Sequence, residues 1–281
     1  MTDATRIAGT GLFTSAPSSL TIRPRTDGGL GFVQAGERIE ASLSRLSRIP
    51  IHPAFAHIPP RSTNLAGPDG QAPRVLTTEH VLAACAGVGL WCADLELAGP
   101  EVPIDAGSAR VFAEAIRDID PSAVEPIRLS EPLTVTDGAA RIEASPAAAD
   151  ETPSWSYCLD YGEGSPIPKQ SAAWTPGDRD AFINEIAPAR TFSLRAEAEA
   201  MKAVGLFQAF GPEQLLVIDD DGQPIDNAWR FDNESARHKL LDVIGDLALL
   251  GRPVHAHIRA VRSGHTLNHQ LAMAIADHIT S

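Results

Sequence analysis

The sequence predicts an α+β protein built from a duplicated unit, with a cleft between the two copies. Short strand-like runs bounded by turn residues occur in both halves of the chain. In each half these runs are followed by a helix that begins with the pattern x-His-x-Leu, at residues 79–82 and 237–240. Further strands or helices follow each of these two helices. Packing of the two copies against each other would bring both helix starts together at the cleft.

The composition is that of a globular protein with one large domain or two ordinary ones. The chain has 281 residues, 43% of them hydrophobic, and a formal net charge of −13. This acidic balance argues against general binding to nucleic acids or anionic membranes, where a basic surface is expected. It leaves room for one anionic small molecule held by a local group of Lys and Arg side chains.

Cysteine usage and the lengths of apolar runs bear on location. The three cysteines, Cys85, Cys92 and Cys158, are odd in number and lack C-x-x-C spacing, which indicates reduced thiols and a cytoplasmic setting. Residues 1–4 have no basic stretch leading into an apolar core, so no signal peptide is expected. The most apolar run, 81–93, is too short to span a bilayer. We therefore expect a soluble cytoplasmic protein without an integral membrane segment.

The first half is expected to begin with short strands joined by turns and to continue with two helices. Thr77 or Thr78 is a natural N-cap for the first of these. Glu79 and His80 then lie in its first turn and point about 100° apart, so His80 could hold a metal ion while Glu79 reaches its bound water. A capping acid beside an incidental histidine is the alternative. The expected elements are strands at 20–22, 30–34 and 91–97, a loop at 61–73, a helix from 79 to the glycines at 87 and 89, and a helix at 109–119.

The second half contains strands and helices around one long helix. The expected elements are strands at 133–136, 141–144, 215–218 and 254–261, a loop at 145–152, and helices at 178–186, 195–204, 234–246 and 266–279. His255 and His257 form a His-x-His pair on the strand 254–261, and we assign this pair to the surface or to a partner contact. The tight turn before the last helix is expected to present His265.

The helix at 234–246 is expected to have two distinct faces. An apolar stripe includes Leu240, Leu241 and Ile244, and a polar row of His238, Asp242 and Asp246 recurs every fourth residue along the opposite face. An imidazole and a carboxylate one turn apart are neighbours and can bind the same cation. The alternative is the solvated polar face of an ordinary amphipathic helix.

Four separated segments, at 77–80, 189–192, 237–246 and 263–265, together resemble one known family. Their order and spacing are similar to those of the UDP-3-O-acyl-N-acetylglucosamine deacetylases, zinc amidases that commit cells to lipid A synthesis. The resemblance extends from Gly9 to about Leu271 and includes the segments 99–104 and 185–190. It implies two α+β sandwiches, each with two helices packed on a sheet, and an active site between them. We expect an N-terminal domain at 1–123 and a C-terminal domain at 127–281.

The resemblance also implies a role for each of the polar residues. Two histidines and one aspartate leave a fourth position for water, the pattern of a catalytic zinc site, with ferrous iron as the alternative metal. The implied ligands are His80, His238 and Asp242. Glu79 is the implied general base, His265 the residue that stabilises the oxyanion or protonates the leaving amine, Asp246 the residue that orients His265 and raises its pKa, and Thr191 a donor to the tetrahedral intermediate.

The substrate implied by the family is a UDP-linked acylated amino sugar. Lys239 and Arg262 are the expected contacts of the diphosphate, which would let a chain of net charge −13 bind an anion. Phe192 and Tyr161 match aromatic contacts near the nucleotide-sugar end of the substrate. We expect a monomer.

Substrate-facing positions depart from the family pattern, whereas the metal and acid–base residues do not. Phe13 stands where the family has histidine, Asp105 is shifted by one position, Pro212 stands in a run of small residues, and Ser165 replaces a histidine before proline. A deacetylase of another acylated amino sugar is therefore one alternative. A non-catalytic binding protein that kept its metal is another, although zinc binding alone would need neither Glu79 nor His265.

Overall fold

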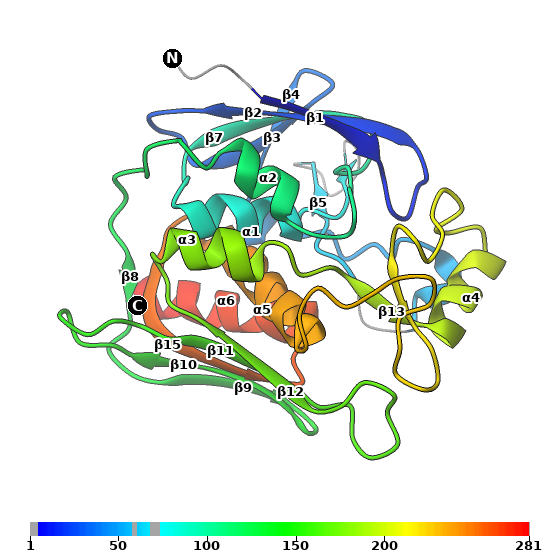
Figure 1. Ribbon diagram of the computed structural model, residues 1–281. Helices are drawn as coiled ribbons and strands as arrows, with labels where there is room; N and C mark the ends of the chain where they lie inside the picture. The colour runs from blue at the N-terminus through cyan, green and yellow to red at the C-terminus, as the bar shows by residue number, and fades with distance from the viewer. Residues whose placement is uncertain (1–4, 58–60, 68–73, 281) are drawn as a thin grey trace.

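The chain folds into four layers, with a sheet, two layers of helices and a second sheet (Figure 1). The computed structural model describes residues 5–57, 61–67 and 74–280. Two mixed sheets with helices between them confirm the predicted α+β class. The strands of the first sheet all precede residue 99, and those of the second all follow residue 126. The division into domains at 1–123 and 127–281 stays a prediction.

The first sheet has the strand order β1-β2-β7-β3-β4. Its strands are β1 (Thr5–Thr10), β2 (Pro17–Pro24), β3 (Leu30–Gln34), β4 (Glu37–Glu40) and β7 (Ala93–Ala98). The predicted strands in this half are confirmed, although β7 begins at Ala93 and not at residue 91. The turn between β2 and β3 contains Gly28 and Gly29, both with positive φ, which a residue with a Cβ rarely adopts. Leu95 and Phe32 pair in register and direct their side chains into the core.

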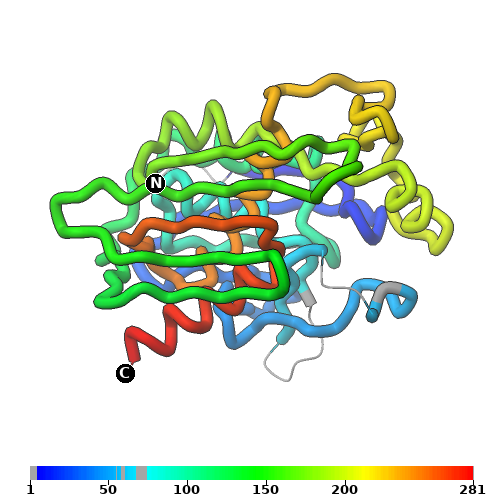
Figure 2. Tube along the Cα trace, turned by 90° about the horizontal axis from the view of Figure 1, so that it is seen from below, coloured from blue at the N-terminus to red at the C-terminus, as the bar shows by residue number. Residues whose placement is uncertain are grey.

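The second sheet has the strand order β12-β11-β15-β10-β9, with β8 also pairing with β15 (Figure 2). Its strands are β8 (Ile127–Arg128), β9 (Leu133–Asp137), β10 (Ala140–Pro146), β11 (Trp155–Leu159), β12 (Gln170–Trp174) and β15 (Val254–Val261). The last of these lies at the centre, parallel to β11 and antiparallel to β10. We did not predict β11 or β12. The predicted loop at 145–152 starts late, because Ser145 and Pro146 still pair with β15.

Two helices from each half fill the space between the sheets. They are α1 (Glu79–Val88), α2 (Arg110–Ala115), α5 (Glu234–Leu247) and α6 (His265–Thr280). Helix α1 ends at Gly89, whose φ of 81° closes the last turn. Thr78 occupies the predicted N-cap position, but its hydroxyl donates to Thr63 O at 2.9 Å and does not cap the helix.

Two helices predicted from the sequence are shorter or less regular than expected. The helix expected at 109–119 ends at Ala115 as α2. The helix expected at 178–186 consists of one α-turn, α3 (Arg179–Ala181), followed by a π-helical turn at Phe182–Ile186. The Ala187 N–H donates to Phe182 O at 2.8 Å, a bond five residues apart, which widens this turn.

Helices α1 and α5 cross at very close range. A Cβ on Gly245 would collide with the backbone carbonyl of Glu79, so only glycine fits at this crossing. Helix α5 also packs against α6, β11 and β12, and nearly all of its residues are buried. His238, Asp242 and Asp246 are all buried, so the alternative interpretation of this helix, a polar face exposed to solvent, is wrong.

A smaller substructure lies beside the four layers, on the right in Figure 1. Strands β13 (Phe192–Leu194) and β14 (Leu216–Ile218) pair in parallel, and helix α4 (Arg195–Ala203) connects to them. Together with Leu12, Phe13 and Ile104, Met201 on this helix and Leu206 after it form a second apolar cluster apart from the main core. Strands β5 (Leu65–Ala66) and β6 (Arg74–Val75) form the remaining pair.

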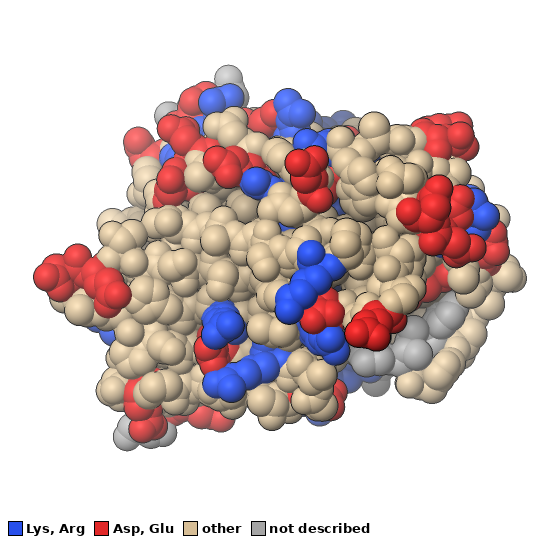
Figure 3. All heavy atoms as spheres, turned by 60° about the horizontal axis from the view of Figure 1, so that its bottom comes forward, with Lys and Arg blue, Asp and Glu red and all other residues tan. Residues whose placement is uncertain are grey.

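No helix within the described ranges is long and apolar enough to cross a membrane. The loop predicted at 61–73 is wrong at Leu65–Ala66, which form β5 by pairing with β6. Its residues 68–73, and residues 1–4 where no signal peptide is expected, fall outside the described residues. The face of the molecule in Figure 3 carries side chains of both charges, with many of the acidic ones near its edges.

Candidate metal centre

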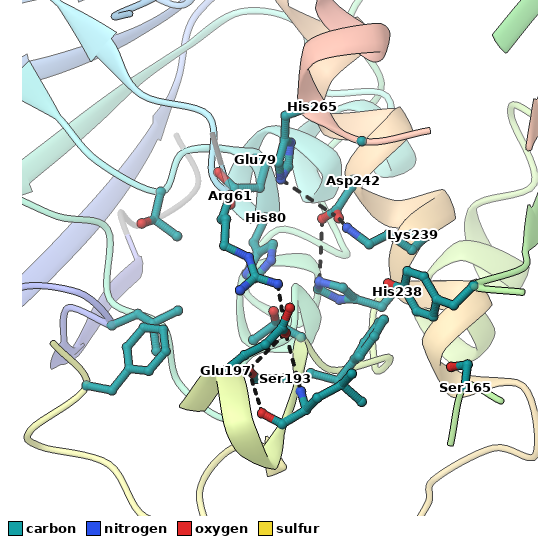
Figure 4. A pocket seen from close by; sticks show the side chains of 18 of the residues that line it. Arg61, Glu79, His80, Ser165, Ser193, Glu197, His238, Lys239, Asp242 and His265 are labelled. Atoms are coloured by element: carbon teal, nitrogen blue, oxygen red, sulfur yellow. Dashed lines mark hydrogen bonds and ion pairs between the residues drawn. The ribbon is translucent and has the colours of Figure 1, made fainter. Parts of the chain in front are cut away.

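The crossing of α1 and α5 brings His80, His238 and Asp242 together, as expected from the duplicated pattern (Figure 4). The two imidazole rings meet edge to face with centroids 5.1 Å apart. His238 Nε2 lies 3.4 Å from Asp242 Oδ1, and one candidate ligand atom from each residue lies within 4.8 Å of the others. Each of the three residues is only 3% exposed. Three donors therefore converge on one buried point.

The protonation states of these residues fit a divalent cation. Burial lowers the pKa of His238, and burial together with the neighbouring His238 lowers the pKa of His80 to about 3, so both rings are neutral near pH 7. His238 Nδ1 lies 3.1 Å from Ala189 O and donates to it, which leaves Nε2 as the nitrogen with a lone pair. His80 Nδ1 is buried without a hydrogen-bond partner in the described part of the chain.

The third ligand candidate carries the negative charge. Burial opposes ionisation of Asp242, but the Lys239 ammonium and the nearby histidines lower the pKa of Asp242 to about 2. Lys239 Nζ lies 2.6 Å from Asp242 Oδ2. Two neutral imidazoles and one carboxylate are the donors that zinc and ferrous iron accept. The residues present therefore fit such a metal.

Glu79 lies beside this set, at the start of α1. Burial raises the pKa of its carboxyl group to about 8. Its Oε2 accepts a hydrogen bond of 2.9 Å from the backbone N–H of Thr63, which fixes the side chain. A carboxyl group whose pKa lies near neutrality can both take and release a proton at physiological pH.

On the other side of the same space is His265, the first residue of α6. Its Nδ1 lies 2.8 Å from Asp246 Oδ2, the pairing expected from the sequence. Burial alone would lower the pKa of His265, but Asp246 and Asp242 raise it to about 9. The ring therefore carries a proton near pH 7. The catalytic roles of both residues stay predictions.

Sequence reasoning missed three further groups around Asp246. Thr63 Oγ1 donates to Asp246 Oδ1 at 2.5 Å, and Asn268 Nδ2 donates to Oδ2 at 2.8 Å. His269 Nε2 lies 3.2 Å from Oδ1. The signal for His269 was present, because it lies four residues after His265 and so on the same helix face. Thr63 lies in a loop, and nothing in the local sequence points to it.

A cavity of about 690 Å³ opens onto the metal centre. Thr191, Phe192, Lys239 and Tyr161 line it, as do Phe13 and Ser165, two of the positions that depart from the family pattern. Arg262 does not belong to this lining and instead pairs with Asp160 at 2.9 Å. The assignment of these residues to the substrate stays a prediction.

A second cavity of about 310 Å³ adjoins the first and shares Leu12, Phe192 and Phe207 with it. Its walls are mostly apolar and include Pro212. Phe13, in the first cavity, packs on Phe207 with ring centroids 5.2 Å apart, and Phe207 lines both cavities, so aromatic side chains lie where the two spaces meet.

The fold and site define a class: proteins with two sheets and two layers of helices between them, in which the helices carry a buried donor set suited to a metal ion, flanked by an acid and a histidine. Comparison with known families makes this specific. Residues 1–277 match the family model of the UDP-3-O-acyl N-acetylglycosamine deacetylases (LpxC). The chain belongs to this family of deacetylases, enzymes that hydrolyse an amide bond, and the resemblance inferred from the sequence is confirmed.

Individual relatives match most of the chain. The UDP-3-O-acyl-N-acetylglucosamine deacetylase of Myxococcus xanthus is 36% identical over 274 residues, covering 96% of this chain and 83% of the relative. That of Leptospira biflexa is 35% identical over 237 residues, covering 83% and 76%. That of Geotalea uraniireducens is 34% identical over 271 residues, covering 94% and 83%.

Proposed function

We propose that this chain removes the N-acetyl group from UDP-3-O-acyl-N-acetylglucosamine, with zinc as its metal, and so catalyses the committed step of lipid A synthesis. The observation that carries the proposal is the buried set of His80, His238 and Asp242 with Glu79 and His265 beside it. The names of the relatives support the substrate, and the neutral imidazoles support zinc, with ferrous iron as the alternative. A cytoplasmic monomer stays our expectation.

His80, His238 and Asp242 would hold the metal. When bound, the metal supplies positive charge that lowers the pKa of a water molecule and polarises the amide carbonyl. Lys239, which pairs with Asp242 Oδ2, keeps this carboxylate ionised and is itself half-buried at the cavity wall. A charge held in this way suits the diphosphate of a nucleotide sugar better than a mobile surface lysine would.

The protein groups on either side of the amide divide the proton transfers. Glu79 accepts a proton from the attacking water as the oxygen of that water bonds to the acetamide carbonyl carbon. The Thr191 hydroxyl, which lines the cavity, donates to the oxyanion of the tetrahedral intermediate. His265, held by Asp246, then gives its proton to the sugar nitrogen as the C–N bond breaks, which releases acetate and the amine.

One observation favours an altered acyl group. Phe13 packs on Phe207 at the passage between the two cavities, and Pro212 lines the second one. A fixed, bulky wall shortens an apolar channel, so we expect higher kcat/KM for an acyl chain shorter than the usual 3-hydroxyacyl group. A series of UDP substrates that differ only in acyl length measures this. If the longest chain is turned over best, the passage is not narrowed.

The direct test is acetate release from UDP-3-O-acyl-N-acetylglucosamine, measured by mass spectrometry on the metal-loaded chain. We expect turnover that falls by roughly 10²–10⁴-fold in Glu79→Gln while the metal content stays the same. Release of acetate only from another acylated amino sugar would replace the proposed substrate. Metal binding without hydrolysis of either compound would instead identify a binding protein and contradict the proposal.

A further inference from the structure

A third cavity lies at the far ends of the two helices that carry the metal ligands. It measures about 420 Å³, and Gly87 and Val88 at the end of α1 and Leu247 at the end of α5 line it. It shares no lining residue with the two cavities described above. Because α1 rises about 1.5 Å per residue, Val88 lies about 13 Å along the helix from Glu79. This space is therefore separate from the hydrolytic site.

Tryptophan side chains form its apolar walls. Trp91, Trp155 and Trp174 all line it, three of the four tryptophans of the chain. Trp155 Nε1 donates to Ala256 O at 3.1 Å, and Trp174 Nε1 donates to Asp178 O at 2.9 Å. Because both indole N–H groups are already hydrogen-bonded to the backbone, these two side chains contribute the apolar parts of their rings to the cavity wall. Such walls suit a flat or extended hydrocarbon.

The charges at the cavity are all of one sign. Its lining includes Arg179 and Arg252 but neither Asp nor Glu among the residues described, although the chain has 36 acidic residues against 23 basic ones. Arg179 donates to the carbonyl oxygens of Ile116 and Ile119, and its Nε is buried with no partner in the described ranges. Arg252 is exposed and makes no ion pair or hydrogen bond with any described residue. Arg179 and Arg252 thus give this cavity two positive charges that no described carboxylate pairs with, so the cavity favours an anionic ligand.

We propose that this cavity is a second ligand site, which binds a medium-chain carboxylate with its hydrocarbon against the tryptophans and its carboxylate at Arg252. A cavity of this size is within the range of small-molecule sites, and the combination of an apolar body with one anionic end matches both halves of its lining. A guanidinium group binds a carboxylate through two parallel hydrogen bonds, which fixes the orientation of the ligand. The proposal does not depend on the reaction at the metal centre.

Tryptophan fluorescence is the natural measurement, because most of the tryptophans line this cavity. The metal-loaded full chain is titrated with decanoate up to about 1 mM, a range that detects weak affinity. We expect a saturable change in fluorescence with decanoate and none with decyltrimethylammonium, which has the same chain and the opposite charge. No saturable change with decanoate, or an equal response to both probes, would overturn the proposal.

Two variants separate this site from the apolar second cavity, where decanoate has another place to bind. Arg252→Glu should weaken binding at least about 10-fold, since it reverses the charge that meets the carboxylate. Lys202→Glu is the matched control, an exposed lysine on the lining of the second cavity, and it should leave the affinity unchanged. The opposite result, with Lys202→Glu weakening binding and Arg252→Glu not, would place decanoate in the second cavity and refute the assignment.

Filling the space provides an independent test. Ala86 lines the third cavity, and Ala86→Phe should abolish the fluorescence change while acetate release stays near that of the unsubstituted chain. If this variant does not fold, the comparison of Arg252→Glu with Lys202→Glu still decides the question. A folded Ala86→Phe variant that binds decanoate normally would contradict the proposal.

Discussion

Two triplets of the same composition include residues of α5 that lie one turn apart, Asp242 and Asp246. His80, His238 and Asp242 form one, and Asp246 with His265 and His269 forms the other. In each, one candidate ligand atom per residue lies within 4.8 Å of the others, and all the residues are buried or nearly so. By composition and spacing alone, either could hold a metal ion. Their hydrogen bonds distinguish them.

The first triplet has nitrogen atoms that make no hydrogen bond with a described residue and could bind a metal ion, whereas the carboxylate of the second is fully hydrogen-bonded. His80 Nδ1 has no partner among the described residues, and His238 is oriented by Ala189 O with its other nitrogen toward Asp242. Asp246, by contrast, accepts from Thr63 and from His269 on Oδ1 and from His265 and Asn268 on Oδ2. These four donors fill the lone-pair positions of a carboxylate. The same residue types therefore suit a cation in one place and hold a proton on His265 in the other.

Loss of a ligand from the first triplet should have the largest effect. His238→Ala leaves two ligands, which hold a catalytic metal poorly, so we expect the metal content to fall from about one ion per chain to a small fraction of that, with loss of acetate release. Elemental analysis of purified protein measures the first. His269→Ala is the matched control in the second triplet and should keep its metal. Loss of metal from His269→Ala, but not from His238→Ala, would reverse the assignment of the two triplets.

Removal of the proton-transfer groups should reduce turnover without releasing the metal. Glu79→Gln and His265→Gln are expected to lower kcat by roughly 10²–10⁴-fold, the usual contribution of a positioned acid or base. Turnover and metal content are measured on the same preparations. A variant with near-normal kcat would remove its residue from the mechanism.

The charge of Asp246 should make stability depend on pH. Burial opposes its ionisation, but His265 and His269 lower its pKa below the ordinary value of about 3.9. The pKa of Asp246 is thus lower in the folded state than in the unfolded state. The stabilisation is therefore complete above the unfolded-state pKa and is lost as the pH falls from there toward the folded-state pKa. The expected loss is on the order of 2 kcal/mol between pH 5 and pH 2. Urea unfolding of the unsubstituted chain and of Asp246→Asn at several pH values in this range measures the free energy of unfolding. An equal dependence of that free energy on pH in both proteins would contradict the prediction.

The smallest effect concerns His269, which is 12% exposed in its side chain and touches Asp246 rather than the cavity. His269→Leu removes one donor to Oδ1 and should lower kcat about 10-fold, as loss of an orienting partner commonly does, with KM unchanged. His269→Gln can place an amide N–H where Nε2 lies and should restore most of the rate. His278→Leu, farther along the same helix, is the control. A change in KM alone would indicate that His269 acts on the substrate instead.

The sequence revealed the parts of the site that depend on helix periodicity. Asp242 and Asp246 follow His238 at intervals of one turn, and α5 keeps that spacing because it is a regular helix. Thr63 could not be found this way, because its position depends on a loop that returns to Asp246 from 183 residues away. Strands β11 and β12 were missed for a related reason: each is only five residues long and gains its place by pairing with a neighbour.

Gly245 has a consequence for the candidate metal centre. It lies on α5 between Asp242 and Asp246, and its bare Cα faces the carbonyl of Glu79 on α1. His80 is the next residue of α1, so the close approach of the two backbones at this point brings the rings of His80 and His238 near each other. An added methyl group would push the helices apart and widen the space between His80 and His238. The approach of the two helices that carry the candidate ligands thus depends on a residue that has no side chain and lies outside the donor set.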